Sequence, residues 1–345
     1  MIDWLTLPQF PCWHPQRIDG GHVLSVDHHG NMEWSSQKFR KVVGSADASI
    51  RLKTAAVDAD GHGTHITIDG NPVKFLQGHN LWGTDDLVGL VVAFMDKLAP
   101  LVGLQPTAWD RQLWLRGCFK VSRADLTRMF RLKSRADALA WIRQAEQTAT
   151  MPYRGRGQIS KGSTLYFGKH SRRSSLKFYA KGQEFDANAS PAMKELPALV
   201  EYADAALRAE YVIRSMELKR LGLDVAANWE ETTASSVTLE VLGKLHMDDY
   251  TMITPERIDE LRPAVRAVYE LWKEGHDIRG MYPKPTFYRY RKQLLDTLSV
   301  DIANVQPRDE KPSNVVPLMR VLEATEMTVP DWAYGTHLYA EPRHA

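Results

Sequence analysis

Apolar and polar residues alternate in short runs through the first two thirds of the chain. This period of two predicts strands with one buried face, because successive side chains of a strand point to opposite sides of a sheet. The clearest runs are residues 2–7, 22–26, 49–55, 65–69 and 119–123. They predict a domain built mainly from short strands.

Three stretches with helical spacing interrupt these strands. One follows Thr84 as its N-cap and carries an apolar stripe to residue 98, a second runs over about 134–147, and a third covers about 191–206. Strands and helices are therefore mixed irregularly, and neighbouring strands form hairpins. This pattern indicates an α+β fold with a mostly antiparallel central sheet and flanking helices.

Beyond about residue 233 the spacing becomes helical. An apolar stripe predicts a helix over 263–273, and Thr286 caps a second helix over 287–295. On the second helix Arg289 and Lys292 point away from the apolar residues. Two interpretations stay open: a helix-turn-helix unit laid against DNA, or an ordinary bundle with a solvated basic face, because the connection is longer than a tight helix-turn-helix turn.

The end of the chain combines prolines with clustered charges. This composition predicts a linker from residue 305, a short helix near 316–324 and a loose tail. We therefore expect three parts: an α+β domain over 1–230, a helical domain over 231–304 and the terminal segment 305–345.

A strongly basic stretch lies near the middle of the chain. Between Glu146 and Glu184 there are eight Lys or Arg residues and no acid, which is the footprint of a polyanion. Within it, 162–168 and 174–181 predict the two strands of a hairpin, joined by the polar and basic turn 169–173.

Tyr179 lies near the end of this hairpin, and strand alternation places Lys181 beside it on the same face. A tyrosine next to a cation in a phosphate-attracting field is suited to attack a DNA phosphodiester and keep the phosphate as a phosphotyrosine. Taken alone, a tyrosine in a strand is far more often a packing residue. Tyr166, the other tyrosine of the hairpin, lies in a predicted core strand and is not expected to react.

Several segments of the chain agree in order with a known family. They are 1–5, 70–83, 164–173, 178–184 and 207–210, which read MIDWL, GNPVKFLQGHNLWG, TLYFGKHSRR, FYAKGQE and LRAE. In these segments the chain resembles the replication initiators of filamentous phages, the gene II and phage X type proteins, which in turn resemble the initiators of some rolling-circle plasmids. The resemblance spans residues 1 to about 300 and implies a rolling-circle, HUH-like nuclease domain.

Two acids are candidates for holding a metal. Asp125 and Glu210 each follow a basic residue on an apolar strand, and both positions resemble the acidic strand motifs of the plasmid initiators. Cleavage of DNA by a tyrosine usually needs a divalent cation, and oxygen ligands suit Mg²⁺ or Mn²⁺. The alternative for either acid is a surface carboxylate paired with a neighbouring arginine.

The histidines give a weaker pattern. Many rolling-circle nucleases use two histidines separated by one apolar residue, and this chain contains no such pair. His79 lies in a glycine-flanked turn that matches the family and is the expected third metal ligand, with a surface residue as the alternative. His62 and His65 have the spacing of a helical metal pair, but the neighbouring glycines favour a turn that enters a strand over a zinc site.

Composition limits the remaining classes. With 345 residues, of which 43% are apolar, the chain is able to bury a substantial core. Cys12 and Cys118 lack the spacing of a metal site or a disulfide framework, and no apolar run approaches the ~20 residues of a membrane span. We expect a protein of the bacterial cytoplasm that does not enter a membrane. Because the net charge is only +2, attraction to DNA must come from local patches.

The combined interpretation is a rolling-circle replication initiator that nicks and rejoins origin DNA at a specific site. The resemblance implies that Tyr179 forms a 5′-phosphotyrosyl link and frees a 3′-hydroxyl, while Lys181 holds the phosphate or lowers the tyrosine pKa. Arg172 and Arg173 are expected beside the scissile phosphate. The full set of residues expected to bind single- or double-stranded DNA is Lys169, His170, Arg172, Arg173, Lys177, Arg289 and Lys292. The family also implies a host helicase and a host polymerase as partners. The alternative is a non-catalytic origin-binding or repressor protein in which Tyr179 merely packs.

Overall fold

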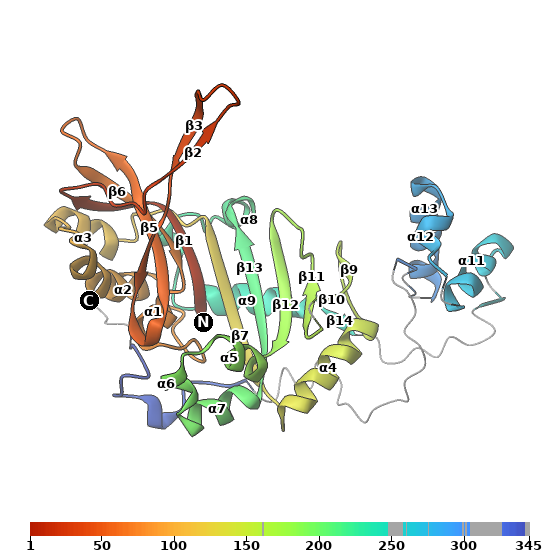
Figure 1. Cartoon of the computed structure of the whole chain (residues 1–345). Coiled ribbons are helices and arrows are strands. Elements are labelled where there is room, and N and C mark those ends of the chain that lie inside the picture. Colours follow the sequence, from red (N-terminus) through yellow and green to blue (C-terminus); the bar gives the residue numbers. More distant parts are fainter. Residues whose placement is uncertain are drawn as a thin grey trace.

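The centre of the protein is a nine-stranded sheet in which every neighbouring pair is antiparallel (Figure 1). The computed structural model describes residues 1–160, 162–247, 258–259, 261–274, 276–298, 300, 302–303 and 326–341. The strand order is β10-β11-β12-β13-β7-β1-β6-β5-β4. The strands span β1 (Ile2–His14), β4 (Arg40–Val43), β5 (Ser49–Val57), β6 (Gly63–Gly70), β7 (Arg123–Arg131), β10 (Gln158–Ser160), β11 (Thr164–Phe167), β12 (Ser174–Ala180) and β13 (Ala206–Arg214). The predicted α+β fold on a mostly antiparallel sheet is confirmed.

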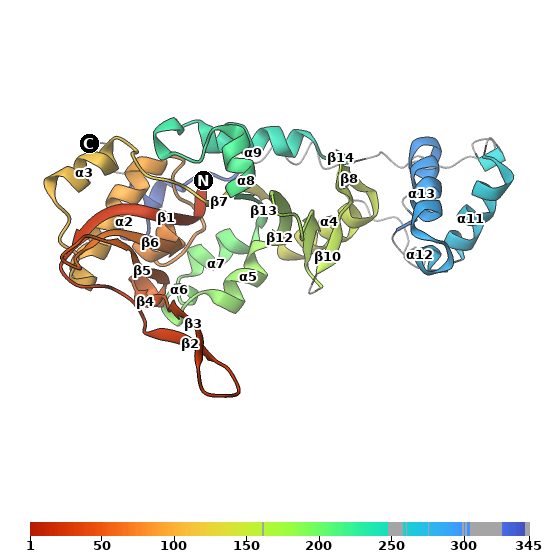
Figure 2. The same ribbon diagram turned by 90° about the horizontal axis from the view of Figure 1, so that it is seen from above.

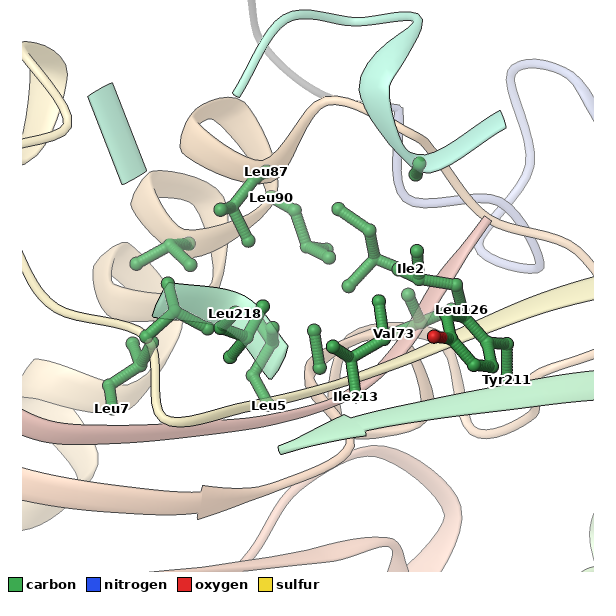
Figure 3. Packing of buried hydrophobic residues seen from close by; sticks show 14 of the residues in the cluster. Ile2, Leu5, Leu7, Val73, Leu87, Leu90, Leu126, Tyr211, Ile213 and Leu218 are labelled. Carbon is green, nitrogen blue, oxygen red and sulfur yellow. The ribbon is translucent and has the colours of Figure 1, made fainter. Parts of the chain in front are cut away.

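One face of this sheet is apolar and is covered by helices (Figures 2 and 3). The alternating pattern directs Leu5, Leu126 and Ile213 toward this face, where they pack with Leu87 and Leu90 of α2. The helices that contribute to this core are α1 (Pro72–Gln77), α2 (Leu87–Val102), α3 (Ala108–Leu115), α4 (Arg135–Thr148), α8 (Ser215–Leu221) and α9 (Thr233–Gly243). Burial of this continuous apolar surface supplies the main stabilisation of the sheet.

The opposite face is polar along its middle strands, and three short helices cover part of it: α5 (Lys181–Asn188), α6 (Pro191–Lys194) and α7 (Pro197–Asp204). The single helix predicted over 191–206 is therefore wrong. Pro197 has no backbone N–H to continue α6 and instead stands at the first position of α7. The predicted strand 174–181 is one residue too long, because Lys181 already belongs to α5 and pairs with Glu184 three residues later.

Smaller elements surround the sheet. A hairpin of β2 (His22–Val26) and β3 (Met32–Gln37) projects from it, and three further strands form a small sheet in the order β14-β8-β9. The remaining bounds are β8 (Ala149–Met151), β9 (Gly155–Arg156), β14 (His246–Met247), η1 (Ser45–Asp47), η2 (Ala226–Asn228) and η3 (Asp331–Ala333). Within the described part of the chain, no helix is long and apolar enough to cross a membrane.

The last described segment, 326–341, packs against the sheet domain. The backbone N–H of Met327 donates to the carbonyl of Met129 on β7 at 2.8 Å, and the hydroxyl of Tyr202 donates to the carbonyl of Thr328 at 2.9 Å. Met327, Ala333 and Leu338 are buried in the same small core as α7. The expectation of a loose tail is therefore wrong for this segment, and the helix predicted near 316–324 lies outside the described residues.

A separate helical unit follows the sheet domain in sequence. It contains α11 (Pro263–Lys273), α12 (Ile278–Met281) and α13 (Lys284–Leu298), which share a core of their own. The helix predicted over 263–273 is confirmed, and the one predicted over 287–295 is extended at both ends. Phe287 and Leu294 are buried while Arg289 and Lys292 are exposed, as their spacing on a helix requires.

Candidate active site

A cavity of about 1050 Å³ opens on the polar face of the sheet. Strand register explains which side chains meet there, because cross-strand partners share a face. Lys177 of β12 pairs with Glu210 of β13, and Glu210 in turn pairs with Thr127 of β7. Asp125 lies two residues from Thr127 on the same strand, so its side chain joins Glu210 and Tyr179 in the lining of the cavity.

The hydroxyl of Tyr179 donates a hydrogen bond to Oε2 of Glu210 at 3.0 Å. The other carboxylate oxygen of Glu210 lies 2.8 Å from Nζ of Lys177, which also sits 5.3 Å from the centre of the Tyr179 ring. Burial raises the pKa of Tyr179; the charge of Arg208 opposes this shift, and the charge of Glu210 adds to it. The tyrosine is therefore protonated at neutral pH, and Glu210 is the group placed to accept its proton.

Asp125 is a buried carboxyl with an unusual pKa. Burial, together with the negative charge of Glu210, raises this pKa to about 7, although two hydrogen bonds from Arg123 act in the opposite direction. These bonds measure 2.8 Å from Nε and 2.7 Å from Nη2. A divalent cation fits this donor set, because two nearby carboxylates on one polar face provide hard oxygen ligands and a cation relieves their repulsion.

Lys181 does not occupy the predicted place beside the tyrosine. It is fully buried in the first turn of α5, and its ammonium group donates to Oδ1 of Asn80 at 2.8 Å and pairs with Glu184. Burial, together with the nearby charge of Arg208, lowers its pKa to about 8. The strand alternation holds for Lys177, two residues before Tyr179, and fails for Lys181 because the strand ends at Ala180.

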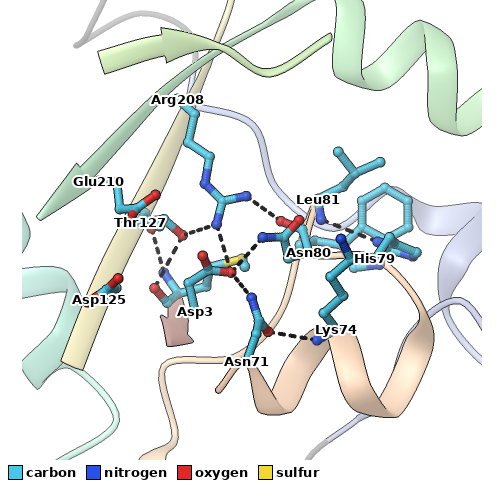
Figure 4. A network of polar contacts seen from close by, with 12 residues as sticks. Asp3, Asn71, Lys74, His79, Asn80, Leu81, Asp125, Thr127, Arg208 and Glu210 are labelled. Carbon is cyan, nitrogen blue, oxygen red and sulfur yellow. Dashed lines mark hydrogen bonds and ion pairs between the residues drawn. The ribbon is translucent and has the colours of Figure 1, made fainter. Parts of the chain in front are cut away.

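A buried polar network lies next to the cavity, and the sequence analysis did not identify it (Figure 4). Arg208, the strand partner of Tyr179, is fully buried, and its Nη2 lies 2.9 Å from Oδ1 of Asp3. Asp3 also accepts hydrogen bonds from Nδ2 of Asn71 at 2.6 Å and from Nδ2 of Asn80 at 2.8 Å. These contacts hold the floor of the site rigid, because a buried ion pair is stable only when its remaining polar atoms are satisfied.

Asp3 reaches this network through a β-bulge. Ile2 pairs with Leu126 and Trp4 pairs with Asp125, so Asp3 is an extra residue without a cross-strand partner on β7. A bulge redirects a side chain in this way. The available signal in the sequence was an acid inside the otherwise apolar run 1–5.

His79 has a structural environment and is not brought together with Asp125 and Glu210. Its Nε2 lies 2.9 Å from the carbonyl of Leu338, and its Nδ1 accepts a hydrogen bond from the backbone N–H of Leu81 at 3.3 Å. Burial lowers its pKa to about 3, so the ring is neutral. With both ring nitrogens engaged, it has no free lone pair for a metal in this arrangement.

The basic turn lies at the far end of the hairpin from Tyr179. Lys169, His170, Arg172 and Arg173 are exposed on the loop between β11 and β12. Six residues of extended chain separate Arg173 from Tyr179, which corresponds to roughly 20 Å. The expectation that Arg172 and Arg173 lie beside the scissile phosphate is therefore wrong, while Lys177 does line the cavity.

Another group of potential metal ligands, Asp58, Asp60 and His62, lies at the turn between β5 and β6. Oδ1 of Asp58 accepts hydrogen bonds from the backbone N–H groups of Asp60 and His62, at 3.0 and 2.9 Å. These bonds explain the cluster as a turn built around Asp58. The predicted turn before a strand is confirmed, since β6 begins at Gly63.

Comparisons with known proteins agree over nearly the whole chain. Residues 1–232 match the family described as the N-terminal part of the replication-associated protein of gene II, and residues 253–338 match its C-terminal part. The replication-associated protein of the same type from Enterobacteria phage I2-2 is 39% identical over 334 residues, which cover 96% of this chain and 95% of that protein. A solved rolling circle replication initiator protein from Geobacillus stearothermophilus aligns with 74% of this chain and 88% of its own, at a TM-score of 0.33 and 10% identity. By its sequence match over both parts, the chain belongs to the gene II family of phage replication-associated proteins.

Proposed function

We propose that this replication initiator nicks and rejoins one strand of origin DNA, with Tyr179 as the nucleophile. The observation that carries the proposal is the hydrogen bond from the Tyr179 hydroxyl to Glu210 inside a cavity that also contains Asp125 and Lys177. A nucleophile bonded to its base, with a cation and a second acid nearby, is the arrangement that phosphoryl transfer to a hydroxyl requires.

In the first step, the Tyr179 oxygen attacks a backbone phosphorus while its proton passes to Glu210. A Tyr–O–P bond forms and the bond from phosphorus to the 3′-oxygen breaks, so the 5′-end becomes linked to the enzyme. The 3′-oxygen leaves as a hydroxyl after taking up a proton, which Glu210 is placed to return. Rejoining is the reverse reaction, in which a 3′-hydroxyl attacks the phosphotyrosine, and it needs no ATP because the phosphodiester bond energy is retained.

Asp125 and Glu210 would hold Mg²⁺ or Mn²⁺, which when bound polarises a phosphate oxygen and offsets the charge that develops there. Arg123 and Lys177 now neutralise these carboxylates and would turn toward the phosphate oxygens once the metal carries that charge. Lys181 holds Asn80 and Glu184 in place and acts on the site through them.

The nucleophile is tested by Tyr179→Phe, which removes one oxygen and leaves the ring to pack. We expect loss of nicking on supercoiled origin DNA and loss of the covalent protein–DNA adduct on a denaturing gel, with nearly unchanged DNA affinity. Tyr211→Phe is the matched control, because Tyr211 lies on the next strand but on the apolar face. Normal nicking by the Tyr179 variant would leave an origin-binding protein without catalysis as the better description.

We further propose that the helical unit contacts duplex DNA through Arg289 and Lys292. Both are exposed on α13, on the side opposite Phe287 and Leu294. Replacing both with alanine should weaken binding to origin duplex and reduce its preference over random duplex, while cleavage of a short single-stranded substrate stays at the parent rate. Undiminished preference for the origin would assign the unit a structural or partner-binding role.

A further inference from the structure

A second hollow, of about 880 Å³, lies at the turn end of the β11–β12 hairpin. Cations from four separate parts of the chain line it: the β8–β9 turn, the hairpin loop, α8 and the end of α9. They are Arg154, Arg156, Lys169, Arg173, Arg220 and Lys244. Their convergence from distant sequence positions marks a surface that tertiary folding assembled.

The hollow keeps an excess of positive charge. Among the described residues that line it, Glu217 is the one acid. Its carboxylate is shared by two of the cations, at 2.7 Å from Nη2 of Arg220 and 3.6 Å from Nη1 of Arg173. One carboxylate in the lining does not balance this set of cations, so the surface attracts a polyanion.

Arg154 has a different task in the same place. Its guanidinium donates to the carbonyl of Phe167 at 3.1 Å and to the hydroxyl of Ser174 at 2.6 Å. These bonds tie the β8–β9 turn to both strands of the hairpin at the start and the end of the basic loop. The cationic wall is therefore fixed in position before any ligand binds, which lowers the entropy cost of binding.

Two aromatic rings accompany the charges. Tyr153 is fully exposed at the tip of the β8–β9 turn, with a positive φ of 61° that favours Gly or Asn over a ring-bearing residue. Tyr166 is half-buried, and Nζ of Lys169 lies 5.3 Å from the centre of its ring. Cations interleaved with aromatic rings are the surface on which unpaired bases stack while the backbone is held electrostatically.

Tyr166 also lines the cavity of Tyr179, so it belongs to both hollows. On the sheet it pairs with Lys177, and the next pair along the same face is Thr164 with Tyr179. The polar face thus runs without interruption from the proposed nucleophile, over Tyr166, to the basic loop.

We propose that single-stranded DNA bound at Tyr179 continues across Tyr166 into this basic hollow, where Tyr153 stacks on an unpaired base. The assignment rests on the proposed nicking function for its starting point, and it adds a binding site about 20 Å from the reacting phosphate. A paired duplex cannot use Tyr153 in this way, because its bases are already stacked on one another.

The test measures DNA binding in a Tyr179→Phe background, so that cleavage does not enter the result. The probes are a short strand limited to the nick site and two strands extended by about ten nucleotides, one on each side. Arg220→Gln with Lys244→Gln should weaken binding of one extended strand only, and lower its salt-dependence slope by about 1.4, since each phosphate contact to single-stranded DNA contributes about 0.7. Tyr153→Ala should weaken the same strand by about tenfold or more.

Lys219→Gln is the matched control, because Lys219 is exposed on α8 next to Arg220 but does not line the hollow. Parent-like binding of both extended strands by the two test variants would overturn the proposal. Equal loss on the short strand, or loss on duplex DNA with single strands unaffected, would overturn it as well. If instead the parent protein fails to nick but the variants still lose the extended strand, the hollow stands and the proposed chemistry falls.

Discussion

The two ends of the β11–β12 hairpin differ in how their charges are treated. At the Tyr179 end, Lys177 and Glu210 are paired with each other, and the carboxylate of Asp125 is closed off by Arg123. At the turn end, Lys169, His170 and Arg172 are exposed on the loop. Buried, paired charges shift pKa values and position a reaction, whereas exposed cations act mainly on a polyanion in solution. One strand therefore joins a region suited to chemistry with a region suited to holding DNA.

The largest expected effect breaks the chemical end alone. Glu210→Gln keeps the shape of the side chain but removes the base for the Tyr179 hydroxyl and a negatively charged metal ligand, so nicking should fall by about 10²–10⁴-fold. The rate should stay low when the Mg²⁺ or Mn²⁺ concentration is raised, because added metal cannot replace a proton acceptor. The salt-dependence slope of DNA binding should not change. Full recovery at high metal would limit Glu210 to metal binding, and parent activity throughout would remove it from the mechanism.

A pH titration tests Asp125 at the same end. The folded-state pKa of about 7 lies above the usual 3.8, so the folded protein binds a proton that the unfolded chain releases in this range. The stability contributed by this group is present below about pH 4 and is lost as the pH rises through 7. Added Mg²⁺ or Mn²⁺ should restore stability most strongly above pH 7, where the carboxyl is ionised.

Asp125→Asn sharpens this test. It should remove the part of the stability change between pH 4 and 7 that belongs to Asp125 and weaken stabilisation by the metal, both measured as thermal midpoints against pH. Asp60→Asn is a suitable control, since Asp60 lies in the exposed β5–β6 turn. A metal response that disappears in the control and persists in the Asp125 variant would move the cation to that turn.

The smallest effect concerns the turn end. Arg172 is exposed on the loop and, in the proposed arrangement, meets DNA through its charge alone. Arg172→Gln should lower the salt-dependence slope of single-strand binding by about 0.7 while the nicking rate at saturating DNA stays at the parent value. A large loss of the saturated rate would show that the two ends are not separable, contrary to the comparison above.

Local patterns were sufficient for the strand that carries the proposed nucleophile. Alternation in 174–180 determines that Lys177 and Tyr179 share a face, and the apolar spacing of β7 and β13 exposes Asp125 and Glu210 on the polar side. The same rule failed at Lys181, because alternation says nothing about the residue where a strand gives way to a helix. Lys177, equally spaced from the tyrosine, was assigned to DNA and not recognised as the cation bound to Glu210.

Long-range contacts decided the rest. The environment of His79 depends on the carbonyl of Leu338, which is 259 positions away in the sequence, and no local pattern contains that information. The network of Asp3 and Arg208 likewise joins the first strand to β13 through a bulge. The basic hollow required four segments to converge around one loop.

The sequence by itself determined the strand and helix periods, the α+β class, the basic hairpin and the family. These features follow from the local spacing of side chains and from ordered motifs, which a linear chain displays directly. Only the tertiary structure decided that Arg172 and Arg173 lie far from Tyr179, that 326–341 packs on the sheet domain, and which cation accompanies Glu210. Register, strand ends and the burial of polar groups are set by contacts between distant residues, and those contacts form when the whole sheet packs.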